Sequence, residues 1–171
     1  SYLTATISKK LAMDMGFEKS GEVFIAGLLH DLGISVLHRF MHTDFVKINA
    51  LILSGIDLNE AELKVFGMSH GEIGETLLKN WNIPELITEV VRYHHTPSLS
   101  QNASVSSSIV HLADYITQML KLGELNWDGM LQLDEHIFTT LHIKDINQLG
   151  EFIEGYREPL KYQMESLKYL L

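Results

Sequence analysis

The chain has 171 residues, of which 46% are hydrophobic and 20% are charged, so its composition is that of a folded domain and not of a disordered tail. At roughly 150 residues per domain, this length predicts one domain and excludes a long repeat array. Twenty-two acidic residues against thirteen basic ones give a formal charge of −9, which makes DNA and anionic membranes poor partners.

The sequence contains no cysteine, which excludes disulfide bonds, thiolate metal sites and cysteine nucleophiles. Its longest apolar runs, 24–29 and 48–53, are far shorter than the roughly 20 residues that a membrane helix needs. We therefore expect a cytoplasmic protein with no nucleic-acid partner and no membrane span. The chain begins at Ser1 without an initiator Met or a signal pattern, which suggests a piece of a longer protein.

Apolar residues recur at helical spacing along most of the chain, and this pattern predicts an all-α fold. The first expected helix carries Leu3, Ile7 and Leu11 on one side and stops near Gly16. Residues 22–31 are apolar on nearly all sides, which predicts a helix in the centre of the domain that Gly33 ends.

Three further helices are predicted in the middle of the chain. Ser69 and Glu72 form a capping box that begins one helix, and Pro84 suits the first turn of the next helix, which ends in a His-His pair. A Ser-rich loop then leads into a helix over about 105–120.

A final amphipathic helix is predicted from Asp145 onwards, with Gln148 as cap partner and an apolar stripe that runs to Leu167. Pro159 should kink or divide it. We expect a core over residues 1–122 and a C-terminal helical segment over 123–171 that packs on it. Pairing of this stripe with another copy of the chain is the alternative.

The polar pair His30 and Asp31 ends the most apolar predicted helix. An unpartnered polar group in such surroundings costs on the order of 1 to 3 kcal/mol, and an unpaired carboxylate costs more. The two side chains therefore need each other, water or a metal ion. A His and an Asp that merely link two helices would satisfy the same argument.

Further histidines lie at helix ends on faces that point to the core. His70 shares the face of Ile73 and Leu77, and His94 continues the stripe of the preceding helix with His95 beside it. Imidazoles and carboxylates without thiolates suit iron, manganese, zinc or nickel, and a pair of metal ions is the usual way in which such sets act on phosphate esters.

A helical wheel places Asp114 opposite Leu112, Ile116 and Met119 but beside Val110, so that it could face a central site or water. For any single buried histidine, the ordinary interpretation is a hydrogen-bonded core residue. We expect surface or capping roles for the remaining histidines: His38, His42, His111, His136 and His142.

These residues fall in segments that resemble the HDOD domain, a relative of the HD-superfamily phosphohydrolases. The segments are AGLLHDLG at 26–33, FGMSHGEIGETLLKNWNIPELITEVVRYHH at 66–95 and VHLAD at 110–114, and the likeness covers about residues 1–122. It implies an all-α, HD-like helical bundle with a metal site between helices, holding one or two divalent ions. Carried over, the ligands are His30, Asp31, His70, His94, His95 and Asp114.

The sequence departs from the family pattern in two places. The family's first histidine normally precedes a Ser, and here the chain begins at Ser1. Catalytic HD-GYP relatives carry a Lys soon after the HD pair and Gly-Tyr-Pro after the tandem histidines, whereas here Ile34 follows Gly33 and Thr96 follows His95.

We therefore expect a bacterial signal-transduction domain whose pocket serves regulation and not catalysis, with a signalling protein or a small phosphorylated ligand as its partner. An active metal-dependent phosphohydrolase acting on nucleotides or cyclic dinucleotides, with Asp31 as the catalytic carboxylate, is the first alternative. An interaction module without metal is the second.

Overall fold

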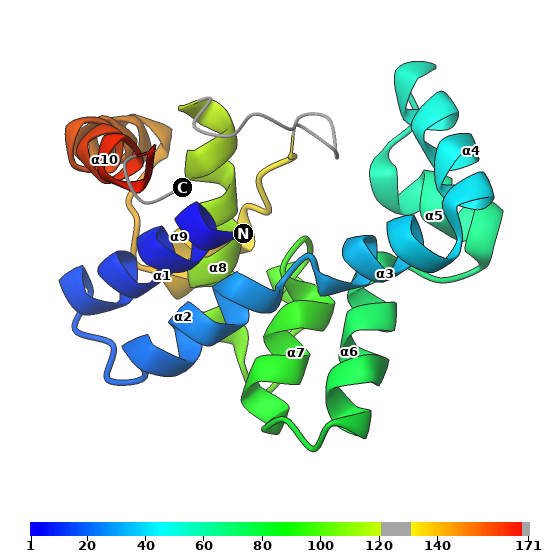
Figure 1. Ribbon diagram of the computed structural model, residues 1–171. Helices are drawn as coiled ribbons and strands as arrows, with labels where there is room; N and C mark the ends of the chain where they lie inside the picture. The colour runs from blue at the N-terminus through cyan, green and yellow to red at the C-terminus, as the bar shows by residue number, and fades with distance from the viewer. Residues whose placement is uncertain (121–130, 169–171) are drawn as a thin grey trace.

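The computed structural model describes residues 1–120 and 131–168, and for 163–168 it describes the backbone only. Over these ranges all regular secondary structure is helical, which confirms the predicted all-α class (Figure 1). The elements are α1 (Tyr2–Asp14), α2 (Ser20–Leu29), α3 (Leu32–Phe40), α4 (His42–Leu53), α5 (Leu58–Phe66), α6 (His70–Asn80), α7 (Glu85–Tyr93), the short 3-10 helix η1 (Pro97–Leu99), α8 (Ser104–Met119), α9 (His136–Thr140) and α10 (Ile146–Lys168).

The centre of the main core is α8 and not α2. From Ser106 to Asp114 every residue of α8 is buried, and this helix contacts α1, α2, α7 and α9. In α2, by contrast, Ile25 and Leu28 are 44% and 42% exposed. The prediction that residues 22–31 form the central helix was therefore wrong, because neighbouring helices cover only one face of α2.

Helix α6 begins as the sequence predicts. The Ser69 hydroxyl accepts a hydrogen bond from the Glu72 backbone, and the Glu72 carboxylate accepts one from the Ser69 backbone. The buried face of α6 differs from the prediction, since Gly74 and Leu78 are buried and Ile73 and Leu77 only half-buried. His70 lies at the start of this buried face and is fully enclosed.

The helices α4 and α5 form a lobe at one end of the molecule (Figure 1). This lobe has its own small core of Ile48, Leu58 and Ala61, separate from the main core around α8. It joins the rest of the fold through α3, which contacts both α4 and α6.

Helix α10 packs on the main core at the other end. Leu149, Ile153 and Leu160 are buried there, and the Tyr156 hydroxyl donates to Oδ2 of Asp14 in α1 at 2.6 Å. The helix continues through Pro159 without division. The predicted stripe residue Leu167 lies outside the described side chains.

One stretch of the described residues, Ser20–Phe40, is long and apolar enough to cross a membrane by those two criteria alone. It comprises α2 and α3, and His30 and Asp31 lie in its middle. Core helices of soluble proteins have the same length and composition, and the absence of a membrane span stays a prediction.

Candidate metal centre

The structure brings together the six candidate residues from distant parts of the chain. His30 and Asp31 lie where α2 gives way to α3, His70 is the first residue of α6, His94 and His95 follow α7 directly, and Asp114 lies in α8. Their connected side chains form what we call the His/Asp cluster: His30, Asp31, His70, His94, His95 and Asp114.

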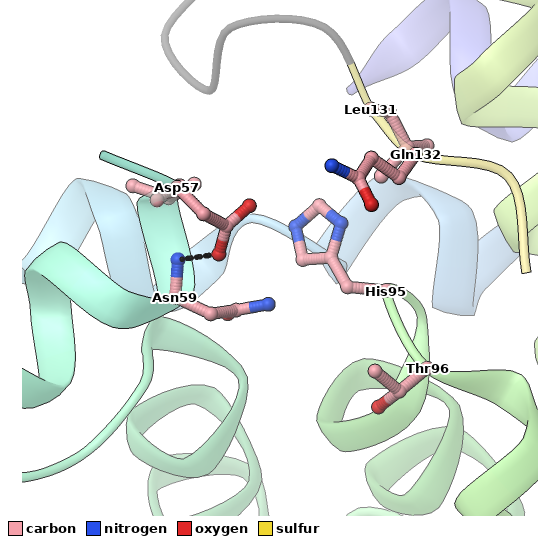
Figure 2. A pocket seen from close by; sticks show the side chains of 7 residues that line it. Asp57, Asn59, His95, Thr96, Leu131 and Gln132 are labelled. Atoms are coloured by element: carbon pink, nitrogen blue, oxygen red, sulfur yellow. Dashed lines mark hydrogen bonds between the residues drawn. The ribbon is translucent and has the colours of Figure 1, made fainter. Parts of the chain in front are cut away.

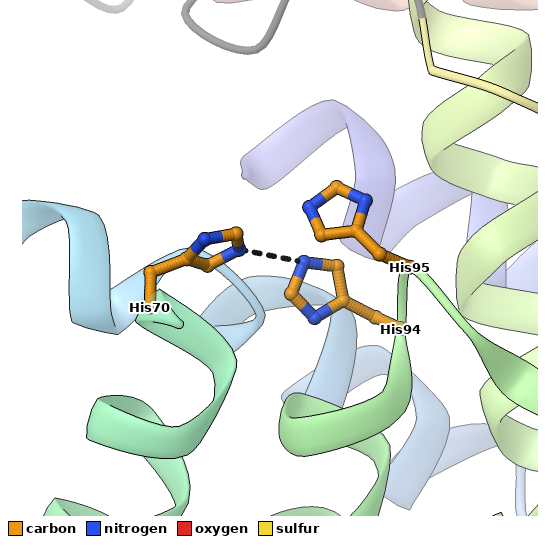
Figure 3. Close-up of side chains that lie close together, drawn as sticks. All are labelled: His70, His94 and His95. Carbon is orange, nitrogen blue, oxygen red and sulfur yellow. Dashed lines mark hydrogen bonds between the residues drawn. The ribbon is translucent and has the colours of Figure 1, made fainter. Parts of the chain in front are cut away.

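Short contacts link the cluster throughout. Nε2 of His30 lies 3.0 Å from Oδ2 of Asp31 and 3.6 Å from Oδ1 of Asp114. Nε2 of His94 lies 3.9 Å from Oδ1 of Asp31 and 3.2 Å from Nε2 of His70. The ring of His95 lies against His94, with the two ring centroids 4.1 Å apart (Figure 3).

Three of the imidazole rings are fixed by hydrogen bonds at Nδ1. His30 Nδ1 donates to the Gly27 carbonyl at 2.8 Å, and His94 Nδ1 donates to the Val91 carbonyl at 2.7 Å. His70 Nδ1 donates to the carboxylate of Glu62 at 2.8 Å. Metal-binding histidines are held in this way, with one ring nitrogen bonded to a carbonyl or carboxylate and the other left for the ion.

The Nε2 atoms that face inward have few partners of their own. Nε2 of His95 is buried and has no hydrogen-bond partner among the described residues, whereas buried Nε2 of His30 faces the carboxylates of Asp31 and Asp114 at 3.0 and 3.6 Å. Because Nδ1 of His94 carries a proton for Val91, its Nε2 presents a lone pair to Nε2 of His70 at 3.2 Å. A cation, either a proton or a metal ion, must lie between two such nitrogens to make the contact favourable.

Burial and neighbouring charges divide the histidines into two kinds. Burial and the adjacent His95 hold the pKa of His94 well below its usual value, and burial, together with His70, lowers the pKa of His95 to about 3. Burial also opposes a charge on His30, but Asp31 and Asp114 outweigh it and raise the pKa of His30 to about 10. The neutral imidazoles of His94 and His95 therefore lie beside the positively charged imidazole of His30.

The carboxylate side of the cluster follows the same logic. Burial would raise the pKa of Asp31, but the charge on His30 keeps it below its ordinary range. Burial opposes a charge on His70 as well, but the hydrogen bond that His70 donates to Glu62 raises the pKa of His70 in spite of it. The carboxylates of Asp31 and Glu62 thus oppose the effect of burial on His30 and His70.

The donor set fits a divalent metal ion. Two sets of residues each offer three ligand atoms that lie within 4.8 Å of one another. One set is His70, His94 and His95, and the other is His30, Asp31 and His94. All of these ligands are nitrogen or oxygen, which suits iron, manganese, zinc or nickel. The arrangement admits one ion or two.

Glu62 is a residue of this site that the sequence did not reveal. It lies in α5, is 1% exposed, and also accepts a hydrogen bond from the backbone nitrogen of His70 at 2.8 Å. Glu62 lies eight residues before His70 and in a different helix, so helical spacing within one helix could not predict their contact. An acidic residue on the buried face of a short helix was the available signal.

The expectation of a surface or capping role for His111 was wrong. His111 is fully buried in α8, donates from Nδ1 to the His94 carbonyl at 2.7 Å and accepts at Nε2 from the Asp134 backbone at 2.9 Å. Burial lowers its pKa, in keeping with a neutral ring that both donates and accepts. It connects the cluster to the segment that precedes α9.

A cavity of about 290 Å³ opens beside the cluster. Figure 2 shows His95 between Asp57 and Asn59, at the start of α5, on one side and Gln132 on the other. Leu58, Thr96 and Leu131 complete the described lining. No Lys or Arg belongs to this described lining.

Comparison with known proteins adds the family. The HDOD domain model matches residues 1–97, more than half of the chain. A Treponema pallidum protein is 30% identical over 128 residues, which are 74% of this chain and 24% of that protein. The chain thus spans about a quarter of the length of this curated relative.

Solved structures share the fold. A Geobacter sulfurreducens HDOD domain protein of unknown function is 25% identical with a TM-score of 0.76, over 97% of this chain and 60% of that one. A Shewanella amazonensis protein provisionally assigned as a phosphohydrolase is 21% identical with a TM-score of 0.72, over 97% of this chain and 61% of that one. A Marinobacter aquaeolei protein provisionally assigned to signal transduction is 21% identical with a TM-score of 0.78, over 99% and 37%.

The two matches at 21% identity establish the fold alone. The family model matches the N-terminal part of the chain, which contains the HD pair, His70 and both tandem histidines. This match establishes the family as well as the fold. This chain belongs to the HDOD domain family.

Proposed function

We propose that this chain is a regulatory domain of a bacterial signalling protein that holds one or two divalent metal ions in the His/Asp cluster and binds a small ligand beside them. The inward Nε2 atoms carry the metal part of the proposal, because three rings are fixed at Nδ1 and Nε2 of His95 is buried without a hydrogen bond. The Marinobacter aquaeolei protein supports the signalling part through its provisional assignment.

His30, Asp31 and His94 would hold one ion, and His70, His94 and His95 are the second group that could do so. Asp114, 3.6 Å from His30, would complete the carboxylate side. A bound metal supplies Lewis acidity, which polarises an oxygen of the ligand. Glu62 and the Gly27 and Val91 carbonyls keep the imidazoles in the orientation that this requires.

The lining of the cavity favours binding over hydrolysis. Enzymes that transfer or release phosphate place cationic side chains or metal ions around the phosphate oxygens. The described lining of the cavity has no Lys or Arg, and Arg92, which lies at the end of α7, is paired with Glu72 and Glu75. A phosphate ester here would depend on the metal alone for its charge neutralisation.

A metal-dependent phosphohydrolase is the second candidate. The complete set of cluster residues favours it, and the provisional assignment of the Shewanella amazonensis protein agrees with it. In this alternative, the metal would lower the pKa of a bound water, and Asp31 would hold the ion that activates it.

Hydrolysis assays separate the two candidates. The purified chain, loaded with Mn²⁺ or Fe²⁺, is incubated with bis-p-nitrophenyl phosphate and with cyclic dinucleotides. We expect turnover well below about 1 per second, the lower end of typical enzymes. Faster turnover that disappears in the Asp31→Ala variant together with the metal would establish the enzyme and overturn the regulatory proposal.

A further inference from the structure

The cavity beside the cluster has one strongly charged wall. Asp57, at the start of α5, faces His95 across the opening (Figure 2). It is the only carboxylate in the described lining, where the other polar side chains are Asn59, Thr96, Gln132 and His95. Every one of these polar side chains can accept a hydrogen bond, and the described lining contains no Lys or Arg.

Asp57 is also the N-cap of α5, and this role removes the groups that would attract an anion. Its Oδ1 accepts hydrogen bonds from the backbone nitrogens of Asn59 at 2.9 Å and Glu60 at 3.3 Å. These are the free N–H groups through which a helix N-terminus otherwise binds anions. The second oxygen, Oδ2, accepts no hydrogen bond among the described residues and remains for a ligand.

The buried Nε2 of His95 supplies the second observation that points to a ligand. It has no hydrogen-bond partner in the described part of the chain, and its ring belongs both to the cluster and to the cavity. A molecule in the cavity therefore reaches the metal site at one end and Asp57 at the other. The volume of about 290 Å³ lies at the lower end of the range for small-molecule sites.

We propose that the cavity binds a small molecule with an anionic, metal-binding head and a cationic, ammonium-type tail, and that Asp57 selects the tail. This inference rests on the proposed function, because the head needs the metal.

Three hydroxamates of similar length test the selection: β-alanine hydroxamate with an ammonium tail, butyrohydroxamate with a neutral tail and succinic monohydroxamate with a carboxylate tail. All three bind metal through the same head. They are titrated into the Co²⁺-loaded full chain at low ionic strength, and binding is followed by the visible absorption of cobalt. We expect the ammonium probe to bind roughly fivefold or more tightly than the carboxylate probe, with the neutral probe between them.

The variant Asp57→Asn removes the charge and keeps a good capping side chain. It should bring the three affinities to within about twofold of one another. Asp57→Ser, which also caps well, serves as a second variant in case the first folds poorly.

Asp145→Asn is the matched control. Asp145 caps the start of α10 with the same pair of hydrogen bonds, from Asn147 at 3.0 Å and Gln148 at 2.9 Å, and it is not among the lining residues. It should retain the order of the wild type.

The outcomes are distinct. Equal affinities in the wild type, no probe binding to the cobalt-loaded chain, or an order that survives in both Asp57 variants would overturn this inference and leave the metal-binding proposal in place. A chain that binds no cobalt would overturn both.

Discussion

The close approach of α3 to α6 depends on the absence of a side chain at Gly33. A Cβ atom at this position would lie 2.0 Å from the carbonyl oxygen of His70, 2.7 Å from its carbonyl carbon and 3.0 Å from its Cα. These atoms are backbone, so no side-chain rotation relieves the clash, and the helices must separate by about 1 Å or more. Overpacking typically costs about 1 to 3 kcal/mol, and Gly33→Ala should reach the upper end of that range.

For a domain of this size, a loss of about 3 kcal/mol lowers Tm by roughly 6 to 12 °C. Thermal unfolding of the metal-free chain, followed by circular dichroism, measures this shift. The same displacement moves His70 away from His30 and Asp31, which directly precede α3, so metal affinity, measured by calorimetry, should fall at least about tenfold.

Gly155→Ala is the matched control for this measurement. Gly155 lies within α10, and a Cβ there would have nothing within 4 Å. The change should raise stability by about 0.5 to 1 kcal/mol, because alanine favours the helix. If Gly33→Ala melts within about 2 °C of the wild type, our account of the α3–α6 contact is wrong.

Three further predictions concern the groups around the cluster. Glu62→Gln should weaken metal binding by about 10- to 100-fold in calorimetry, because the Glu62 carboxylate orients His70. The control variant Glu60→Gln changes an exposed partner of Lys64 and should leave metal affinity unchanged. Equal effects of the two variants would refute the role of Glu62. His111→Phe removes a donor to the His94 carbonyl and an acceptor for the Asp134 backbone, and should cost about 2 to 4 kcal/mol in urea denaturation; a loss below about 0.5 kcal/mol would contradict this. The pKa of His95 is about 3 in the folded chain and 6.5 in the unfolded chain. Between these two pH values, His95 is therefore protonated in the unfolded metal-free chain but not in the folded one. Stability should therefore fall as the pH drops from 6.5 towards 3, by up to about 1.4 kcal/mol per pH unit, and urea denaturation curves that do not change over this window would exclude a neutral His95.

Local signals in the sequence were sufficient for several elements. The capping box at Ser69 and the cap at Asp145 are formed as predicted, because each depends on side chains that bond to backbone within three residues. The all-α class follows equally from spacing along the chain. Such features need no knowledge of distant contacts.

Features set by tertiary packing were less accessible. The apolar run of α2 suggested a central helix, yet that place belongs to α8, which carries the polar residues His111 and Asp114. His111 is buried because its ring bonds two backbone groups that are 17 and 23 residues away in the chain. Periodicity carries no information about partners at that distance.

The candidate site shows the same division. The ends of α2 and α7 marked His30, Asp31, His94 and His95 as polar groups in apolar surroundings, and the resemblance to the HDOD family joined them to one site. Glu62 and the cavity wall at Asp57 come from the α4–α5 lobe, whose placement depends on how α3 packs against α6. No local pattern links this lobe to the tandem histidines.

Metal content tests the central claim most directly. The chain is expressed in medium rich in iron and manganese, purified without chelators and measured by mass spectrometry of the elements, beside the double variant His70→Ala/His94→Ala. We predict about one or two divalent ions per chain in the wild type and less than about a tenth of that in the variant. A wild-type chain with far less than one ion, or a variant that retains the full amount, would contradict the metal centre.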